Sequence, residues 1–335
     1  MRYIEDDFND TTILITGGAG FIGSNLAYYF QENHPKVKVV VLDIFRSNEK
    51  LSNGSLKSFG YFKNLIDFKG EIICGDIKDK NILDVLCKNY RFDYIFHEAG
   101  ITDTTYKEQT FMMSTNLSVY KNLLDIAVDH KATMIYASSS DVYGDAKSPQ
   151  CVGRENPQNI YGFSKLAMDN LTKEYIKKSD ISIVGLRYFN AYGKNEFFKG
   201  ESSSIILQLG IQFLSNKSLE VRKKNDKVLH DFTYIEDIIQ ANIKAMKAKK
   251  SGIYNIGTGR ARSFEDIIEV LEKKFKTKRE IYYNKNSYLD RYSFFTQADI
   301  EISKWALEYK PMYNLEDGIE DYLDYIQKIY EQEVK

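Results

Sequence analysis

Short runs of β-branched and other apolar residues alternate with helix-like stretches through the first half of the chain. Strands are predicted at residues 12–16, 37–43, 71–74, 93–97, 133–137 and 181–186. Amphipathic stretches follow the first of these through Phe30, cover residues 112–128, and surround Tyr161. Strands that alternate with helices in this way predict an α/β fold, a doubly wound parallel (Rossmann) sheet covered by helices on both faces.

The pattern loosens after residue 190. Helices are predicted at residues 203–214, 235–248, 263–274 and 314–331, with short strands at 253–256 and 280–283. We expect a smaller, mixed α/β C-terminal domain that closes over the end of the sheet. The predicted dinucleotide-binding domain comprises residues 1–186 with 231–258, and the predicted substrate-binding domain comprises 187–230 with 259–335, because the chain is expected to cross between them.

Composition narrows the classes of partner. The net charge is −1, so neither nucleic acid nor a membrane surface is an expected partner. Three scattered cysteines form no disulfide framework and no metal-binding spacing, the four histidines are equally scattered, and we expect no metal. The N-terminus lacks the pattern of a signal peptide, and no apolar run approaches the ~20 residues of a membrane span. A cytoplasmic protein is expected.

A glycine-rich turn follows the first predicted strand and opens the first helix. It reads Gly17-Gly18-Ala19-Gly20-Phe21-Ile22-Gly23. Glycines at 17, 20 and 23 allow a tight turn, backbone approach to a pyrophosphate, and close packing of helix on strand. The helix N-terminus then faces the phosphates with unpaired N–H groups. The placement between strand and helix favours a dinucleotide site over a plain turn.

Acidic residues end the second and third strands. Asp43 lies where a carboxylate usually accepts hydrogen bonds from the adenosine ribose, which favours NAD. Arg46 and Lys50 follow it and are able to hold the 2′-phosphate of NADP, so the residues alone leave the two cofactors open. Asp76 and Ile77 are predicted to frame the adenine, with an ordinary loop aspartate as the alternative.

Tyr161 and Lys165 are four residues apart in the segment Ile160-Tyr161-Gly162-Phe163-Ser164-Lys165. On a helix this spacing stacks both side chains on one face. A free tyrosine has a pKa of roughly 10, and a neighbouring positive charge favours its phenolate. The pair is a candidate for taking a proton from an alcohol while a hydride leaves its carbon. An ordinary solvated helix face has the same spacing, so the pair needs further support.

That support comes from the end of the fifth strand, Ala137-Ser138-Ser139-Ser140-Asp141-Val142-Tyr143-Gly144. Hydroxyl groups at the carboxyl end of a central strand can hydrogen-bond a substrate oxygen. Serines also cap loops, which is the alternative. Together with the glycine turn and the Tyr161/Lys165 pair, the serines favour a catalytic role.

With residues 186–193 (LRYFNAYG), these segments resemble the extended short-chain dehydrogenase/reductase superfamily, the nucleotide-sugar epimerases and dehydratases, over nearly the whole chain. Further segments resemble one family within it, the ADP-L-glycero-D-manno-heptose 6-epimerases. They are residues 97–105 (HEAGITDTT), 111–116 (FMMSTN), 197–200 (FFKG), 257–264 (GTGRARSF), Arg291-Tyr292 and 295–299 (FTQAD).

The resemblance implies epimerisation of ADP-D-glycero-D-manno-heptose to ADP-L-glycero-D-manno-heptose at carbon six, by transient oxidation with bound NADP, for the inner core of bacterial lipopolysaccharide. It also implies a homo-oligomer. Ser139 would orient the reacting oxygen, Tyr161 would be the acid/base supported by Lys165, and Lys199 would be a second acid/base. Without the resemblance, Lys199 reads as a surface or phosphate-binding lysine.

Other matching positions carry binding roles by resemblance. Dinucleotide contacts are implied at Gly17, Gly20, Phe21, Ile22, Gly23, Asp43, Ile44, Lys50, Asp76, Ile77, Lys80, Glu98, Ala99, Gly100, Asn116 and Ala191. Substrate contacts are implied at Asn190, Gln208, Arg222, His230 and Tyr292.

Three residues depart from the family pattern. His230 stands where an arginine usually holds the substrate diphosphate, and Arg222, Lys223 or Lys224 could compensate. Lys194 replaces a proline. Asp141 occupies a position at which 4,6-dehydratases carry an acid. A hexose 4-epimerase or 4,6-dehydratase is therefore the nearest alternative, and a non-catalytic dinucleotide-binding regulator is a remote one.

Overall fold

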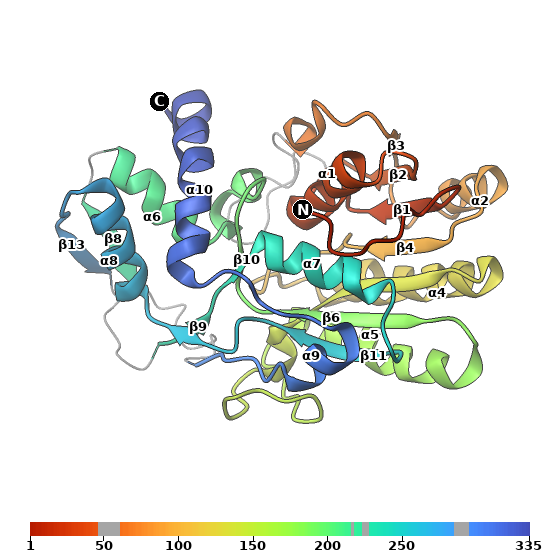
Figure 1. The fold of residues 1–335 in the computed structure, drawn as a ribbon. Coiled ribbons are helices and arrows are strands. Elements are labelled where there is room, and N and C mark those ends of the chain that lie inside the picture. The colour runs from red at the N-terminus through yellow and green to blue at the C-terminus, as the bar shows by residue number, and fades with distance from the viewer. Residues whose placement is uncertain (46–60, 216–217, 223–227, 285–294) are drawn as a thin grey trace.

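A parallel sheet forms the centre of the molecule, seen in the right half of Figure 1. This computed structural model describes residues 1–45, 61–215, 218–222, 228–284 and 295–335, and only the backbone of residues 201, 220–222 and 284. Within them, seven strands are hydrogen-bonded in the order β11-β6-β5-β4-β1-β2-β3, all parallel. Their bounds are β1 Thr12–Thr16, β2 Lys38–Asp43, β3 Glu71–Cys74, β4 Tyr94–His97, β5 Thr133–Ser139, β6 Ile183–Tyr188 and β11 Gly252–Ile256.

The strand order places a binding crevice at one edge of the sheet. β1 pairs with β2 on one side and with β4 on the other, so the direction of winding reverses at β1. Ligands of open α/β sheets bind at such a switch point, outside the carboxyl ends of the strands. The glycine turn after β1 and the strand ends of β4, β5 and β6 meet at this edge. The fold class predicted from the sequence is confirmed.

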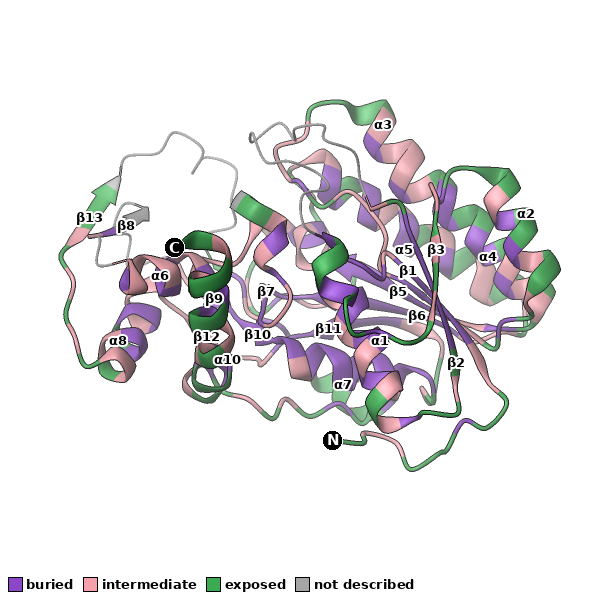
Figure 2. Ribbon diagram, turned by 90° about the horizontal axis from the view of Figure 1, so that it is seen from above, coloured by how far each residue is buried: buried purple, intermediate pink, exposed green. Residues whose placement is uncertain are grey.

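Helices cover both faces of the sheet, which is why its strands are almost continuously apolar. In β2, Val39 and Val41 pack into the core beneath α1 (Phe21–Asn33) and α7 (Ile235–Ala245), whereas Val40 and Leu42 pack into the core beneath the opposite helices. Those opposite helices are α2 (Lys80–Asn89), α4 (Val119–His130) and α5 (Ile160–Lys178). Figure 2 shows the buried strands between the two helical layers.

A second group of helices, with short strands around it, lies at the left of Figure 1. α6 (Ile205–Leu214), α8 (Phe264–Phe275) and α10 (Leu315–Ile329) pack on one another and share the core of α1 and α7. Short strand pairs surround them: β7 (Ala191–Tyr192) with β10 (Thr233–Tyr234), β8 (Leu219–Arg222) with β13 (Ile281–Asn284), and β9 (His230–Asp231) with β12 (Ala261–Arg262). α9 (Glu301–Leu307) packs near β11.

Two predictions about elements are corrected. The helix predicted at residues 112–128 is interrupted: α3 (Gln109–Met113) leads into a π-helical turn, η2 (Ser114–Ser118), before α4 begins. The third strand ends at Cys74, so Asp76 and Ile77 lie in the loop beyond it. The loop places Ile77 in the core and keeps Asp76 partly exposed.

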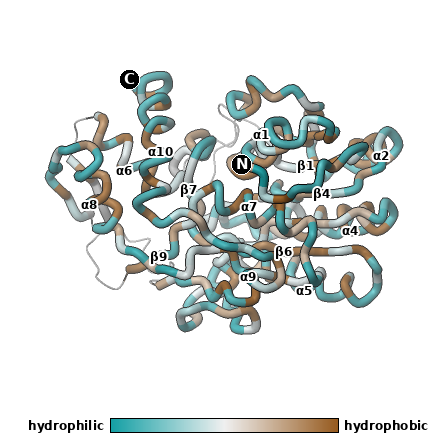
Figure 3. The backbone as a smooth tube through the Cα atoms, in the orientation of Figure 1, coloured by the Kyte–Doolittle hydropathy of each residue, from teal (hydrophilic) through white to brown (hydrophobic). Residues whose placement is uncertain are grey.

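Hydropathy follows the layers of the fold. Apolar segments lie along the strands and on the inward faces of helices, and the outer helix faces are hydrophilic (Figure 3). Among the helices of the described ranges, none combines the length and the apolar character needed to cross a bilayer. The other described elements are short. They are the 3₁₀ segments η1 (Tyr61–Leu65), η3 (Ser140–Tyr143) and η4 (Phe197–Ser202), and the C-terminal η6 (Tyr330–Val334).

Candidate active site

The glycine turn is built as the sequence predicts. Gly17 has a φ of +70° and lies against the backbone of Ala99, so that a Cβ there would come within 2.6 Å of the Ala99 nitrogen. A Cβ on Gly23 would come within 2.3 Å of the carbonyl oxygen of Gly17, which explains the close approach of α1 to the turn. Among the described residues, a Cβ on Gly20 would meet only that carbonyl, at 3.1 Å. This leaves room beside Gly20 for a ligand within the described part of the turn.

The start of α1 fits a dinucleotide pyrophosphate. Gly20 is the N-cap, and within the described part of the chain no side chain caps the helix, so the first N–H groups of this 13-residue helix are candidates to bind a ligand. Phe21 is buried and Ile22 partly buried at this end. Asp43 accepts hydrogen bonds from the backbone N–H groups of Ala19 (3.0 Å) and Phe45 (2.8 Å), which hold its carboxylate beside the turn.

The segment after β4 closes the floor of the site. His97 is buried, its Nδ1 is 2.8 Å from the hydroxyl of Thr16, and burial lowers its pKa to about 3. Glu98 accepts a hydrogen bond from the phenol of Tyr188 at 3.0 Å. Burial raises the pKa of Glu98 to about 7, against the opposing effects of Tyr188 and Lys165. At neutral pH the imidazole of His97 is thus uncharged, whereas the pKa of Glu98 lies close to the pH itself.

Asn116 lies in the π-helical turn η2 and ties this floor to α5. Its side-chain oxygen accepts the N–H of Ile101 at 2.9 Å, and its amide donates to the Ile101 carbonyl at 3.1 Å and to the Ser164 hydroxyl at 2.9 Å. A Cβ on Gly100 would lie 3.1 Å from the Asn116 oxygen and 3.6 Å from the Lys165 nitrogen. Gly100, Asn116 and Lys165 are therefore neighbours in the folded chain.

Tyr161 and Lys165 occupy the start of α5, which begins after the N-cap Asn159. Lys165 is only 2% exposed, and its Nζ lies 5.9 Å from the centre of the Tyr161 ring. Among the described residues, the Nζ makes one hydrogen bond, to the Ala137 carbonyl at 2.8 Å. An ammonium has three donors, so two remain for the hydroxyls of a ribose. Burial lowers the pKa of Lys165 to about 8.

The pKa of Tyr161 is raised in the structure, whereas the sequence predicts that the neighbouring lysine lowers it. Burial raises its pKa above the usual value, and the carboxylate of Asp141 raises it further, while the neighbouring Ser139 hydroxyl opposes them. In the protein alone Tyr161 is therefore a proton donor at neutral pH. A further positive charge in the site, such as that of an oxidised nicotinamide, is the physical requirement for its phenolate.

Ser139 ends β5 and lies beside both groups. Its hydroxyl donates to Asp141 Oδ2 at 3.1 Å and accepts the backbone N–H of Asp141 at 3.1 Å. Asn159 approaches Asp141 Oδ1 at 3.4 Å. The predicted trio of Ser139, Tyr161 and Lys165 is brought together at the carboxyl end of the sheet, with Asp141 as a fourth member.

Lys199 lies in η4, far along the chain but near the glycine turn. Its Nζ is 5.2 Å from the centre of the ring of Phe21, the first residue of α1. Buried Glu196 holds this segment: it accepts the N–H of Gly193 (3.1 Å), the N–H and hydroxyl of Ser204 (2.6 and 2.7 Å) and the hydroxyl of Tyr322 (3.0 Å).

The turn that leads into η4 is tied to the dinucleotide half of the molecule. Asn25 donates to the Lys194 carbonyl at 2.9 Å, and Asn195 donates to the Ser24 hydroxyl at 3.1 Å. Asn64 donates both to the Asn195 carbonyl (3.1 Å) and to the Ala19 carbonyl of the glycine turn (3.0 Å). Lys199 is therefore anchored to the same body as the cofactor turn.

The predicted substrate contacts form a second group. Asn190 is exposed, and its amide reaches the Thr296 hydroxyl at 3.1 Å and the Asp231 carbonyl at 3.3 Å. His230 is buried, with Nδ1 3.2 Å from the same Thr296 hydroxyl and its ring stacked on Phe264. The imidazole is thus packed into the wall of the site, in contrast to an extended arginine that reaches a diphosphate.

The other predicted positions are placed as follows. Gln208 lies on α6 and donates to the Ser203 carbonyl at 2.9 Å, and Ala191 lies in β7. Ile44 is exposed just after β2, and Lys80 is exposed at the start of α2. Arg222 is described by its backbone, in β8. Lys50 and Tyr292 lie outside the described residues.

Comparison with known proteins agrees with this geometry. The model of the NAD dependent epimerase/dehydratase family matches residues 13–257. The chain belongs to that family. It is 32% identical over 326 residues to an ADP-L-glycero-D-manno-heptose-6-epimerase of Brachyspira hyodysenteriae, covering 94% of this chain and 98% of that one.

Two solved structures of epimerases are also similar to this chain in fold and in sequence. The crystal structure of the Helicobacter pylori ADP-L-glycero-D-manno-heptose-6-epimerase has a TM-score of 0.89 and 49% identity, over 98% of this chain and 99% of that one. The UDP-glucuronic acid 4-epimerase of Bacillus cereus, in complex with UDP-glucuronic acid and NAD, has a TM-score of 0.81 and 29% identity, over 96% and 100%. The resemblance inferred from the sequence is confirmed, and the chain is a nicotinamide-dependent isomerase of nucleotide sugars.

Sequence reasoning missed several residues that position the candidate catalytic groups. Asn159 caps the Tyr161 helix by accepting the Gly162 N–H at 2.7 Å, and an asparagine just before a helical pattern is a recognisable signal. Glu196 and Asn64 had no such signal, because their partners are distant in the sequence. Tyr188 was seen only as part of a family motif.

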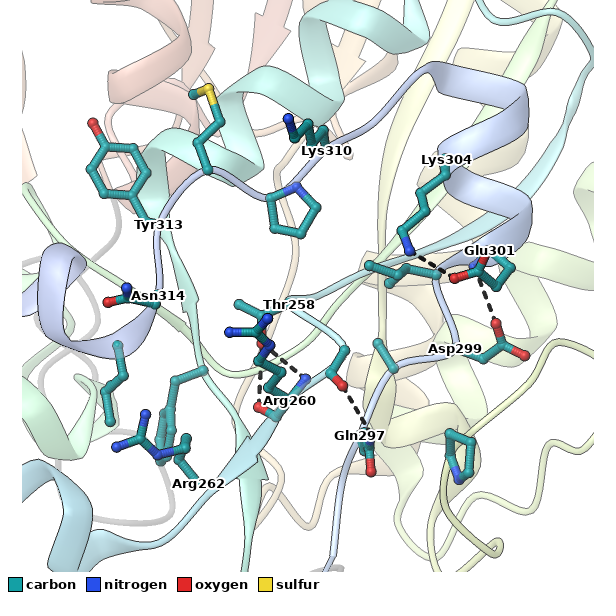
Figure 4. Close-up of a pocket in the computed structure, with 18 of the residues that line it drawn as sticks. Thr258, Arg260, Arg262, Gln297, Asp299, Glu301, Lys304, Lys310, Tyr313 and Asn314 are labelled. Atoms are coloured by element: carbon teal, nitrogen blue, oxygen red, sulfur yellow. Dashed lines mark hydrogen bonds and ion pairs between the residues drawn. The ribbon is translucent and has the colours of Figure 1, made fainter.

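A hollow of about 860 Å³ lies away from the catalytic trio, between the end of β11, the segment before α9, and the segment before α10 (Figure 4). Its charged side chains are largely engaged within the chain: Lys304 pairs with Glu301 at 2.7 Å, and Arg262 pairs with Glu316 at 2.7 Å. Gln297 donates to the Gly259 carbonyl at 2.8 Å. Among the described residues that line it, none is Ser139, Tyr161, Lys165 or Lys199.

Proposed function

We propose that this chain converts ADP-D-glycero-D-manno-heptose to ADP-L-glycero-D-manno-heptose by oxidation at carbon six and reduction from the opposite face, with NADP as its cofactor. The observation that carries the proposal is the position of Lys199 beside Phe21 at the start of α1, where we propose that it acts as a second proton-transfer group in addition to Tyr161. The likeness to two ADP-heptose epimerases along the whole chain supports it.

The cofactor supplies the acceptor and donor of the hydride. The glycine turn and the uncapped start of α1 would hold its pyrophosphate, and Lys165, which has two free donors among the described residues, would hold the nicotinamide ribose. Asp43 lies beside the turn to receive the adenosine ribose. Lys50, which lies outside the described residues, is proposed to hold the 2′-phosphate that distinguishes NADP from NAD.

The chain's own residues then move protons. In the oxidation, one base takes the proton of the carbon-six hydroxyl as the hydride leaves the same carbon, giving a ketone. The end of the substrate that carries carbon six rotates while the nucleotide stays bound near Asn190 and His230. The hydride returns to the other face, and a second group gives a proton to the oxygen. Tyr161, oriented with Ser139, and Lys199 are the two groups.

Removal of one proton-transfer group tests this function. Lys199→Met should lower the rate of epimerisation at least 100-fold, because one direction of proton transfer loses its partner. The measurement is NMR of carbon six of ADP-D-glycero-D-manno-heptose incubated with the purified protein. Lys194→Met, a surface lysine in the same loop that pairs with Asp321, is the matched control and should keep its activity. Full epimerisation by Lys199→Met would contradict the two-base proposal.

The wild-type reaction tests the substrate. Epimerisation without added cofactor is expected if the dinucleotide remains bound through purification, and the nucleotide released on denaturation should be NADP. A protein active on a UDP-hexose at carbon four, and inactive on the heptose, would support the 4-epimerase alternative instead. We further propose that the protein is a cytoplasmic homo-oligomer, which light scattering and cell fractionation test.

A further inference from the structure

Asp141 is an acidic residue inside the catalytic centre to which the proposed reaction assigns no task. It lies in η3, directly after the strand that presents Ser139, and its side chain turns back toward that strand. Ser139 Oγ donates to Asp141 Oδ2 at 3.1 Å, and Asn159 approaches Oδ1 at 3.4 Å. Asp141 is thus held from both sides by residues that flank Tyr161 in the fold.

The backbone also locks Asp141 against the helix that carries Tyr161. A Cβ on Gly162 would come within 2.4 Å of the Asp141 carbonyl oxygen, so glycine is required at the residue after Tyr161. Burial raises the pKa of the Asp141 carboxyl, and the hydrogen bonds from Ser139 and Asn159 oppose that change. Neither Ser139 nor Asn159 carries a charge that would neutralise Asp141. Asp141 therefore acts on the site through its hydrogen bond with Ser139 and through the electrostatic effect of its negative charge.

The hydroxyl of Ser139 has a single proton to donate. While Asp141 accepts it, Ser139 presents only lone pairs to Tyr161 and to the substrate oxygen. The same proton donated to Tyr161 instead would lower the pKa of the phenol, so Asp141 and Tyr161 compete for it. A phenol can donate to such a lone pair, whereas a phenolate cannot. The negative charges of Asp141 and Glu98 add to burial in raising the pKa of Tyr161, and the Lys165 ammonium lies 5.9 Å from the ring.

We propose that Asp141 is a positioning residue that takes the hydroxyl proton of Ser139 and thereby keeps Tyr161 in its proton-donating form. This inference rests on the proposed epimerisation. Its consequence concerns the ketone formed at carbon six, because a protonated Tyr161 returns its proton to the ketone oxygen as the carbon accepts a hydride. No atom is gained or lost overall. Asp141 therefore shortens the life of the ketone and opposes its release.

The variant Asp141→Asn tests this role through its pH profile. The acid limb of kcat/KM should move to lower pH by about one unit, because the phenolate of Tyr161 loses a repelling charge and an uncharged amide competes less strongly for the Ser139 proton. The fraction of bound cofactor in the reduced form during turnover, measured by its near-ultraviolet absorbance, should rise severalfold. A role in folding alone would lower activity without either change.

The matched control is Asp145→Asn, an exposed acid in the following loop that accepts a hydrogen bond from Asn156, and its pH profile should equal that of the wild type. If Asp141→Asn does not fold, Asp141→Ser removes the same charge and carries the same expectation. An unchanged acid limb in a folded variant, with an active wild type, overturns the inference. An inactive wild type instead overturns the proposed epimerisation.

Discussion

At the scale of single residues, the three glycines of the cofactor turn differ in what surrounds their missing side chains. A Cβ on Gly23 would meet the backbone of Gly17 and Gly18 at 2.3 and 2.7 Å. A Cβ on Gly20 would meet one carbonyl at 3.1 Å and no other atom of the described residues within 4 Å. Gly23 is needed for the packing of the protein itself. Gly20 is needed only for the approach of a ligand to the turn.

Alanine substitutions separate these two roles. Gly23→Ala should lower the free energy of unfolding by about 1–3 kcal/mol, because α1 must move away from the turn. Gly20→Ala should unfold at nearly the wild-type temperature but bind the dinucleotide at least tenfold more weakly. Thermal unfolding and calorimetric titration with NADP measure the two effects. Equal losses of stability in both variants would show that the contacts at Gly20 are also internal.

At the scale of elements, the sequence predicts the strands and the long helices but misplaces breaks within them. Residues 112–128 have an uninterrupted helical pattern, yet η2 separates α3 from α4. The break follows from the tertiary hydrogen bonds of Asn116 to Ile101 and Ser164, which no local pattern encodes. The two-residue strands β7, β9, β10 and β12 are too short to produce a periodic signal.

The position of η4 depends on one buried acid, Glu196, which can be tested by substitution. Glu196→Ala removes the acceptor for the N–H groups of Gly193 and Ser204, and Lys199 should lose its fixed position. We expect kcat to fall at least tenfold, with cofactor affinity unchanged, because within the described part of the chain the Glu196 carboxylate is hydrogen-bonded to Gly193, Ser204 and Tyr322 and to no residue of the glycine turn. Steady-state kinetics and cofactor titration provide the measurements.

The control for Glu196 is Tyr322→Phe, which removes one of the four hydrogen bonds to the same carboxylate. Its kcat should stay within about threefold of the wild type, since a single hydrogen bond is worth about 1 kcal/mol at most sites. A loss of cofactor affinity in Glu196→Ala would contradict a role confined to η4.

At the scale of the whole molecule, the sequence predicts the doubly wound sheet and the catalytic trio, because each depends on local patterns and on the rule that parallel strand ends meet at one edge. It cannot predict that Lys199 lies beside Phe21, since these residues are far apart in the chain and come together only through the packing of η4 on α1. Without the family resemblance, the residues alone favour a surface role for this lysine. The proposed division into two domains remains a prediction.

Truncation tests how the late segments complete the sheet. A chain that ends at residue 230 lacks α7, nine of whose residues are buried, and β11, which pairs with β6 along five residues. We expect no cooperative unfolding transition for it in circular dichroism. A chain that ends at residue 329 loses only the terminal η6, which has no buried residue, and should unfold as the full chain does. A cooperative transition in the shorter fragment would show that the sheet folds without its last strand.

The hydrogen bonds of Asn25, Asn64 and Asn195 have a geometric consequence for stereochemistry. They fasten the base of the Lys199 loop to the same rigid body that carries Tyr161 and the glycine turn. In the proposed reaction, these bonds keep the backbone that carries Lys199 at a constant distance from the glycine turn. The inversion of configuration is then expected to come from rotation of the sugar, with no rearrangement of the protein around it.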